Sequence, residues 1–181
     1  KLQATSFKLQ GENPGLACGL RLAAYSHLWS ASDVFDIHSI TLGKDITAED
    51  ISEDLEFLDD WEERYRYIID LGKQLPELPD ELKTEDRFVR GCQSQVWLET
   101  DYDSDADTLY LAVDSDALIV KGLAAIVLSA LNRQSPRAIH DYDMDAFFDR
   151  IDLLNHLSPT RGNGLRAMVG KIKQQAQSLT A

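Results

Sequence analysis

Apolar positions in the first clearly patterned segment recur at spacings of four and three residues. Ile51, Leu55 and Leu58 form this stripe, which is the repeat of an amphipathic helix. Thr47 precedes the stripe, and Asp50 lies three residues after Thr47. This is the arrangement of a capping box at a helix start. The pattern therefore predicts a capped helix that begins just after Thr47.

A second helical stripe follows directly, from about residue 60. It consists of Trp61, Tyr65, Ile68 and Leu71, which share one face of a helix. Gly72 comes at the end of this stripe, and glycine often ends a helix in a left-handed conformation. We therefore expect the second helix to stop at Gly72.

The middle of the chain has the pattern of a β-hairpin. Pro76 and Pro79 favour an extended path after the second helix. Residues 95–100 and 108–113 are then rich in strand-forming side chains, and the polar segment 101–107 separates them. Two antiparallel strands joined by a turn are therefore expected.

Helices are predicted again after the hairpin. Residues 117–131 are almost wholly apolar, and their length indicates a buried helix that packs on the hairpin. Pro136 suits the first turn of a short helix, and further amphipathic helices are expected over 145–154 and 165–179. The order predicts an α+β fold, in which a small antiparallel β-sheet packs against several helices.

The first 45 residues differ from the rest of the chain. They contain scattered glycine and proline and show no sustained hydrophobic period, apart from a short helical pattern over 20–29. We therefore expect residues 1–45 to be a loosely ordered N-terminal extension and residues 46–181 to form the folded domain.

Charge and composition exclude several functions. The net charge of −13 disfavours binding to nucleic acid or to an anionic membrane surface, although it suits a basic protein partner. No apolar run is long enough to span a bilayer. Two cysteines, Cys18 and Cys92, cannot make a disulfide framework, so we expect free thiols and a cytoplasmic location.

Cys92 is the strongest candidate for chemistry. It precedes a predicted strand and follows Gly91, which can adopt backbone conformations closed to other residues. Gln93 and Ser94 come next, and their polar groups could donate hydrogen bonds to a thiolate or a persulfide. A structural cysteine more often has apolar neighbours, so a reactive and an inert Cys92 are both open on composition alone.

Nearby charges bear on the same cysteine. Arg87 and Arg90 are close in sequence, and positive charge lowers the pKa of a thiol. Cys18, among apolar residues, has the pattern of a packed or incidental thiol. A redox pair of Cys18 and Cys92 stays open, although nothing in the spacing indicates one.

Other chemistries have weaker support. The acidic residues Asp101, Asp103 and Asp105 have the spacing of an EF-hand start, but Ala106 replaces the required glycine. The four histidines lack metal-binding spacing, so no metal site is predicted.

A cysteine hydrolase or a thiol peroxidase would use Cys92, and His156 is the best candidate for a partnering histidine. A binding module with an inert Cys92 is a further alternative.

Four sequence blocks together resemble the SufE/CsdE family of sulfur acceptors, in the family's order and at similar spacing. They cover much of residues 50–180, and the first 45 residues lie outside the resemblance. The blocks are WEERYRYIIDLGKQLPELPDEL (61–82), GCQSQVWL (91–98), DSDALIVKGLAAIVL (114–128) and HLSPTRGNGLRAM (156–168).

The resemblance implies roles for individual residues. Cys92 corresponds to the cysteine that carries sulfur as a persulfide, with Gly91, Gln93 and Ser94 as its supporting neighbours. Arg161 corresponds to an arginine near the active-site loop, and Asp114, Ser115 and Asp116 to the segment before the buried helix. Residues 162–163, Gly-Asn, depart from the Ser-Gln that is common in the family.

The resemblance also implies a function and partners. The protein would accept sulfur from a cysteine desulfurase of the SufS/CsdA type, stimulate that enzyme, and supply iron–sulfur cluster assembly, with an iron–sulfur scaffold complex as a further candidate partner. Pyridoxal phosphate would belong to the desulfurase, and this chain would bind no cofactor of its own. The GCQSQVW block favours the SufE-like branch over the CsdE-like branch, which remains the alternative. A monomer or a weak homodimer is expected.

Overall fold

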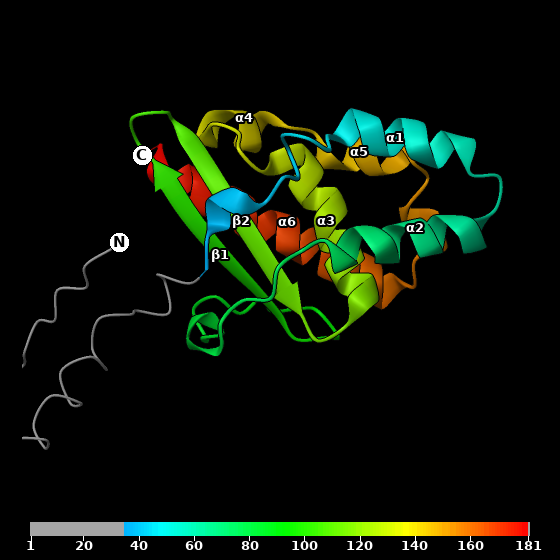
Figure 1. Ribbon diagram of the computed structural model, residues 1–181, viewed down its shortest axis with the longest axis horizontal. Helices are drawn as coiled ribbons and strands as arrows, with labels where there is room; N and C mark the ends of the chain where they lie inside the picture. The colour runs from blue at the N-terminus through cyan, green and yellow to red at the C-terminus, as the bar shows by residue number, and fades with distance from the viewer. Residues whose placement is uncertain (1–34, 181) are drawn as a thin grey trace, which may run out of the picture. The chain divides into compact units, whose positions relative to one another are not determined.

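The computed structural model describes residues 35–180, which form helices around one β-hairpin (Figure 1). In this part of the chain, no helix is both long enough and apolar enough to cross a membrane. The elements follow in the order η2 (Ile37–Ser39), α1 (Ala48–Phe57), α2 (Trp61–Lys73), η3 (Asp80–Leu82), β1 (Val96–Asp103), β2 (Thr108–Ser115), α3 (Leu118–Leu131), α4 (Pro136–Asp141), α5 (Met144–Arg150), η4 (Leu154–His156) and α6 (Pro159–Leu179).

The hairpin forms the only sheet among the described residues. β1 and β2 are antiparallel, with Val96 opposite Ser115 at one end and Asp103 opposite Thr108 at the other. The turn is held by the carboxylate of Asp103, which accepts hydrogen bonds from the backbone amides of Asp105 and Ala106. The predicted hairpin is therefore confirmed, and so is the α+β fold class.

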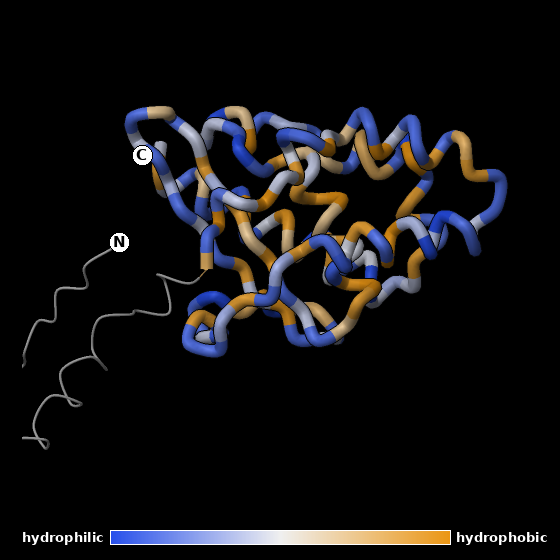
Figure 2. Tube along the Cα trace, in the orientation of Figure 1, coloured by the Kyte–Doolittle hydropathy of each residue, from blue (hydrophilic) through white to orange (hydrophobic). Residues whose placement is uncertain are grey.

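Helix α3 is the centre of the packing. It contacts α1, α2, α6 and β2, and Figure 1 shows it running between these elements. Nearly all of its residues are buried, and the chain is mostly hydrophobic through α3 in Figure 2, whereas the α1–α2 turn is mostly hydrophilic. The apolar run over 117–131 is thus the buried helix that its pattern predicts.

The capping box of α1 is present as predicted, because Thr47 and Asp50 each accept a hydrogen bond from the other's backbone amide. Helix α2, however, continues past Gly72 to Lys73, and Gly72 is not left-handed. A Cβ atom on Gly72 would lie 2.5 Å from the backbone nitrogen of Gly122 in α3. The expected helix stop at Gly72 is therefore wrong: this glycine is needed where the two helices cross closely.

Two helix boundaries after the hairpin also differ from the prediction. The helix expected over 145–154 ends at Arg150, and Asp152 then adopts a left-handed φ of 52°. The last helix begins at Pro159, with the Ser158 side chain as its N-cap, rather than at Leu165. The glycines at the start of this helix weaken its apolar pattern, which hid the first turns from sequence analysis.

Three apolar side chains between residues 37 and 42 pack into the core, although the sequence pattern assigns this segment to an extension. Ile37, Ile40 and Leu42 are buried. The buried side chain of Asn132 donates to the carbonyl of Leu42 at 2.7 Å and accepts from the amide of Leu111 at 2.8 Å. The helix predicted over 20–29 lies outside the described residues.

Candidate functional site

Cys92 lies on a short loop between a stem segment, residues 86–89, and strand β1. We call residues 90–95 the cysteine loop. Its base is closed by a hydrogen bond of 2.8 Å from the amide of Val89 to the carbonyl of Val96. On the outgoing side, the amide of Gln95 donates to the carboxylate of Asp116 at 3.0 Å. Gly91 has a φ of +93°, a conformation that glycine adopts without strain, so it turns the chain toward the body of the protein.

The thiol of Cys92 contacts helix α6. Its Sγ atom lies 3.4 Å from the carbonyl oxygen of Gly164, to which it donates a hydrogen bond. A Cβ atom on Gly164 would lie 3.2 Å from Sγ and 3.3 Å from the Cα of Cys92. Gly164 thus provides the space for the cysteine, a role that sequence analysis missed because glycine in a helix has many possible causes.

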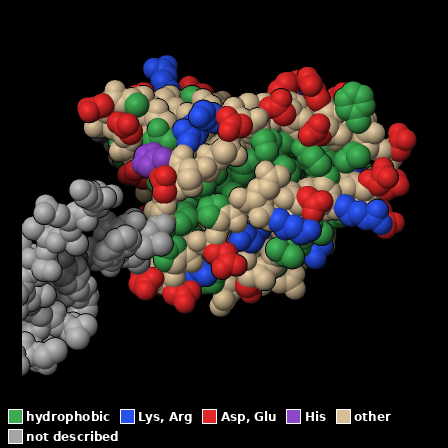
Figure 3. Space-filling model, in the orientation of Figure 1, with side chains coloured by type: hydrophobic (Ala, Val, Ile, Leu, Met, Phe, Trp, Pro, Cys, Tyr) green, Lys and Arg blue, Asp and Glu red, His purple; other side chains and the backbone are tan. Residues whose placement is uncertain are grey.

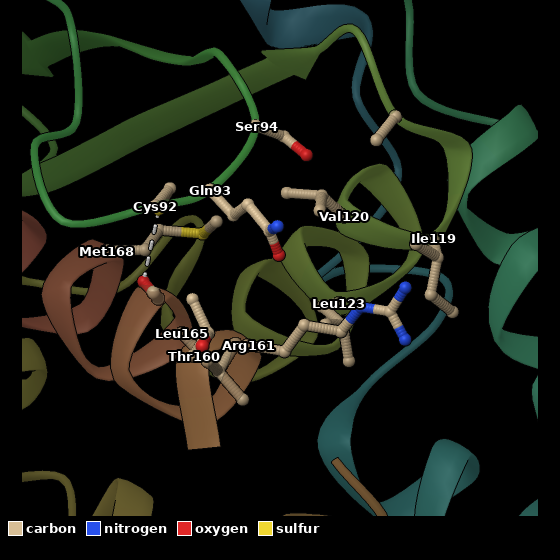
Figure 4. A pocket seen from close by; sticks show the side chains of 12 residues that line it. Cys92, Gln93, Ser94, Ile119, Val120, Leu123, Thr160, Arg161, Leu165 and Met168 are labelled. Atoms are coloured by element: carbon tan, nitrogen blue, oxygen red, sulfur yellow. Dashed lines mark hydrogen bonds between the residues drawn. The ribbon is translucent and has the colours of Figure 1, made fainter. Parts of the chain in front are cut away.

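A cavity of about 360 Å³ adjoins the thiol (Figure 4). It lies between the cysteine loop, the first turns of α3 and the first turns of α6. Its volume is within the range of small-molecule sites. The apolar part of its wall consists of Ile119, Val120, Leu123, Leu165 and Met168.

Three predicted site residues join Cys92 in this cavity. Gln93, Ser94 and Arg161 all line it. In Figure 4 the Gln93 side chain extends into the space beside the thiol, and the Arg161 side chain runs past Leu123 with its guanidinium group away from the sulfur. The structure therefore brings the loop residues and Arg161 to one cavity, although Cys92 and Arg161 are 69 positions apart in the sequence.

Asp114 lies elsewhere. Its side chain is buried and does not line the cavity, but it pairs with Lys121 at 3.0 Å and with Lys83 at 3.2 Å. Burial raises the pKa of the Asp114 carboxyl group, but its bonds to the two lysines and to the Leu78 amide outweigh this effect and lower it overall. Asp114 thus anchors Lys121 in the first turns of α3, the helix that forms one cavity wall.

The two arginines near Cys92 in sequence do not lower the pKa of its thiol, in contrast to the expectation from the sequence. Arg87 is paired with Glu99, and Arg90 with Glu85. Burial raises the pKa of the Cys92 thiol, and no charged group lowers it. The expectation that Arg87 and Arg90 activate the thiol is therefore wrong for this conformation, in which the neutral thiol is favoured.

No histidine in the described residues lines the cavity of Cys92. His156 instead stacks on Trp61, with ring centroids 3.7 Å apart, and its Nε2 lies 3.1 Å from the carboxylate of Asp152. The cysteine–histidine arrangement of a hydrolase is therefore not assembled with His156. In the acidic segment at the end of β1, the Asp103 carboxylate caps backbone amides of the turn. Residues 35–180 contain no group of three or more histidine, cysteine or acidic side chains arranged for a metal ion.

The protein is an α+β protein with a half-buried loop cysteine held against a helix glycine, and comparison with known sequences identifies its family. The family model described as "SufE: Fe-S metabolism associated domain" matches residues 49–176. The chain therefore belongs to the SufE family, which is associated with iron–sulfur metabolism. The predicted family resemblance is confirmed.

Individual relatives agree. The chain is 46% identical over 131 residues to an uncharacterised SufE-like protein of Rhizobium meliloti, covering 71% of this chain and 94% of the relative. A SufE-like protein of Rhizobium etli is also 46% identical over 131 residues, covering 71% and 88%. The fold is similar to the solution structure of a hypothetical protein from Thermus thermophilus, with a TM-score of 0.61, 22% identity, and coverage of 74% of this chain and 96% of that one.

Proposed function

We propose that Cys92 accepts sulfur as a persulfide from a cysteine desulfurase, that the protein thereby stimulates this enzyme, and that it delivers the sulfur to iron–sulfur cluster assembly. The family's association with iron–sulfur metabolism supports the proposal. The observation that carries it is the placement of Cys92: one loop cysteine whose thiol adjoins an apolar cavity.

The transfer step is a thiol–disulfide type of exchange. The Cys92 thiolate attacks the outer sulfur of a persulfide on the desulfurase cysteine. A new sulfur–sulfur bond forms on Cys92 while the bond to the enzyme's inner sulfur breaks. The enzyme cysteine leaves as a thiolate and takes up the proton that Cys92 lost, so that no external oxidant or reductant is needed.

The resting position of Cys92 suits storage rather than attack. Burial raises its pKa and favours the neutral thiol, which is a poor nucleophile. The apolar wall formed by α3 and α6 limits the access of water and reductants to the sulfur, and the cavity has room for one additional sulfur atom. Sheltering matters because an exposed persulfide is easily reduced or oxidised.

Delivery requires the cysteine loop to leave this position. The loop is fixed at its base by the Val89–Val96 hydrogen bond and by the bond between Gln95 and Asp116. The thiol itself is held by one hydrogen bond to Gly164 at 3.4 Å, and thiols are weak donors. We propose that the loop swings out on its base, so that Cys92 becomes solvated, ionises and reaches the desulfurase site.

The proposed partner is a cysteine desulfurase of the SufS/CsdA type, which holds the pyridoxal phosphate. The GCQSQVW block favours a SufE-like over a CsdE-like pairing. Acidic side chains, with several basic ones among them, lie around the hydrophobic centre of the face in Figure 3. The net charge is −13, so a basic contact region on the partner is favoured. The proposal includes a cytoplasmic setting, where thiols stay reduced, and delivery of the sulfur to a scaffold complex.

The test uses the full chain, a purified desulfurase and sulfur-labelled cysteine, followed by intact mass spectrometry. We expect wild-type protein and the Cys18→Ser control to gain one labelled sulfur, and Cys92→Ser to gain none. Desulfurase turnover should rise with wild-type protein and not with Cys92→Ser. Equal stimulation by Cys92→Ser would instead support a binding module with an inert cysteine. No added sulfur with either the SufS or the CsdA class of enzyme would overturn the proposal.

A further inference from the structure

One face of α6 follows the chain that leads into Cys92. Gly164 and Ala167 are three residues apart and therefore share a face of this helix. Gly164 contacts Cys92, and a Cβ atom on Gly91 would lie 3.4 Å from the Cβ of Ala167. Residues later in α6 thus contact residues earlier in the loop: Gly164 contacts Cys92, and Ala167 lies beside Gly91.

Lys171 continues this row, because it lies seven residues after Gly164 and so about two turns further along the same face. Its Nζ atom donates to the carbonyl of Asp86 at 2.6 Å and to the carbonyl of Phe88 at 2.8 Å. The stem and the start of the cysteine loop, residues 86–92, therefore run antiparallel to α6 from Lys171 to Gly164.

The direction of the stem carbonyls explains why a lysine is needed. The amide of Val89 and the carbonyl of Arg87 point toward β1, where both are hydrogen-bonded. Groups alternate along an extended chain, so the carbonyl of Phe88 points the other way, toward α6. The backbone amides in the middle turns of a helix are already hydrogen-bonded within the helix, so they cannot donate to the Phe88 carbonyl. The ammonium group of Lys171 donates to this carbonyl instead.

We propose that Lys171 is a positioning residue for Cys92, which holds the stem of the cysteine loop against α6 and so limits how often the thiol leaves its cavity. The inference deepens the proposed function, because exposure of this thiol is the step that sulfur transfer requires. Lys171 makes two hydrogen bonds from a charged donor, whereas the thiol makes one bond to Gly164, and bonds from a charged donor are stronger than those between neutral groups.

Helix α6 also contains a matched control. Lys173 donates from Nζ to the carbonyl of His140 at 3.1 Å and to the carbonyl of Tyr142 at 2.7 Å. It therefore has the same side chain, the same helix and the same number of bonds to backbone carbonyls. Its two partners lie at the end of α4 and do not line the cavity of Cys92.

The test measures exposure of the thiol without any desulfurase. In a Cys18→Ser background, Cys92 is alkylated with iodoacetamide and the reaction is followed by intact mass. Removing two charge-assisted bonds should make Lys171→Met react about tenfold faster, whereas Lys173→Met should stay within about twofold of the parent. Lys171→Arg, which can still donate to both carbonyls, should restore most of the slow rate.

The sign of the effect separates positioning from electrostatics. Loss of a positive charge raises the pKa of a nearby thiol and so slows alkylation, whereas release of the loop speeds it. An unchanged or slower rate in Lys171→Met, or an equal acceleration in Lys173→Met, would overturn the inference. Lys171→Gln provides the same comparison if Lys171→Met does not fold. Because the assay contains no desulfurase, its outcome is independent of whether sulfur transfer occurs.

Discussion

Gly164 and Cys92 approach each other so closely that even a methyl group on residue 164 would press on the sulfur. A Cβ atom on Gly164 would lie 3.2 Å from the cysteine Sγ, while the glycine carbonyl accepts the thiol hydrogen bond. The same residue therefore creates the space for the sulfur and provides its only hydrogen-bond partner among the described residues. Five predictions follow from this contact and from other close contacts in the structure.

Enlarging residue 164 should expel the thiol. Gly164→Val places methyl groups where Sγ now lies, so the alkylation rate of Cys92 should rise about tenfold or more and the free energy of unfolding should fall by about 1–3 kcal/mol. Gly170→Ala is the control, since a Cβ atom there meets nothing within 4 Å. It should stabilise the helix by up to about 1 kcal/mol and leave alkylation unchanged. A slow alkylation rate in Gly164→Val would contradict the described position of Cys92.

The half-buried thiol of Cys92 should make the stability of the protein depend on pH. Burial raises the folded-state pKa of Cys92, so its contribution is fully present below the unfolded-state pKa of about 8.5 and is lost as pH rises through the folded-state value. Urea unfolding of wild type and Cys92→Ser is compared between about pH 7 and 10. As pH rises, the free energy of unfolding of the wild type should fall relative to that of Cys92→Ser. A constant difference would show that the thiol is not desolvated.

Asp114 should be important for folding through its two lysines. Asp114→Asn leaves Lys121 and Lys83 without their shared carboxylate, and breaking a buried ion pair in this way costs about 3–5 kcal/mol. Asp70→Asn is the control, since its pair with Lys73 is exposed and contributes less than about 1 kcal/mol. The measurement is urea unfolding. Similar losses in the two variants would mean that the Asp114 cluster behaves like a surface pair.

Acid should weaken the same cluster. Because the folded-state pKa of Asp114 is lowered, its contribution is present above the unfolded-state value of about 3.9 and is lost as pH falls through the folded-state value. Wild-type stability should therefore fall more steeply than that of Asp114→Asn between about pH 5 and 2. Parallel curves for the two proteins would contradict this assignment.

The crossing of α2 and α3 should tolerate no side chain at Gly122. A Cβ atom there would lie 2.1 Å from the carbonyl oxygen of Ile68, and backbone atoms cannot yield as a flexible side chain would. Gly122→Ala should therefore lower the midpoint of thermal unfolding by about 8 °C or more, whereas Gly170→Ala should not. An unchanged midpoint for Gly122→Ala would show that the helices can separate at no cost.

Local patterns were sufficient for most secondary structure. The capping pair Thr47 and Asp50, the strand-turn-strand segment after residue 95 and the apolar run of α3 were all read correctly, because these signals depend on residues close in sequence. The errors have a common cause. The pattern predicts a helix end at Gly72 and assigns no role to Gly164, but each glycine is required by a neighbour distant in sequence, which no local pattern reveals.

Cys92, its polar neighbours and the membership of the SufE family could be determined from the sequence by itself, since the motif around the cysteine is contiguous and the four family blocks have a recognisable order. Tertiary structure alone decided the state of the thiol. Arg87 and Arg90 are near Cys92 in sequence but are bound to glutamates, whereas Gly164, Arg161 and Lys171 reach the cysteine loop or its stem from α6. The pKa and the accessibility of a side chain depend on what surrounds it in space, and chain packing determines those surroundings.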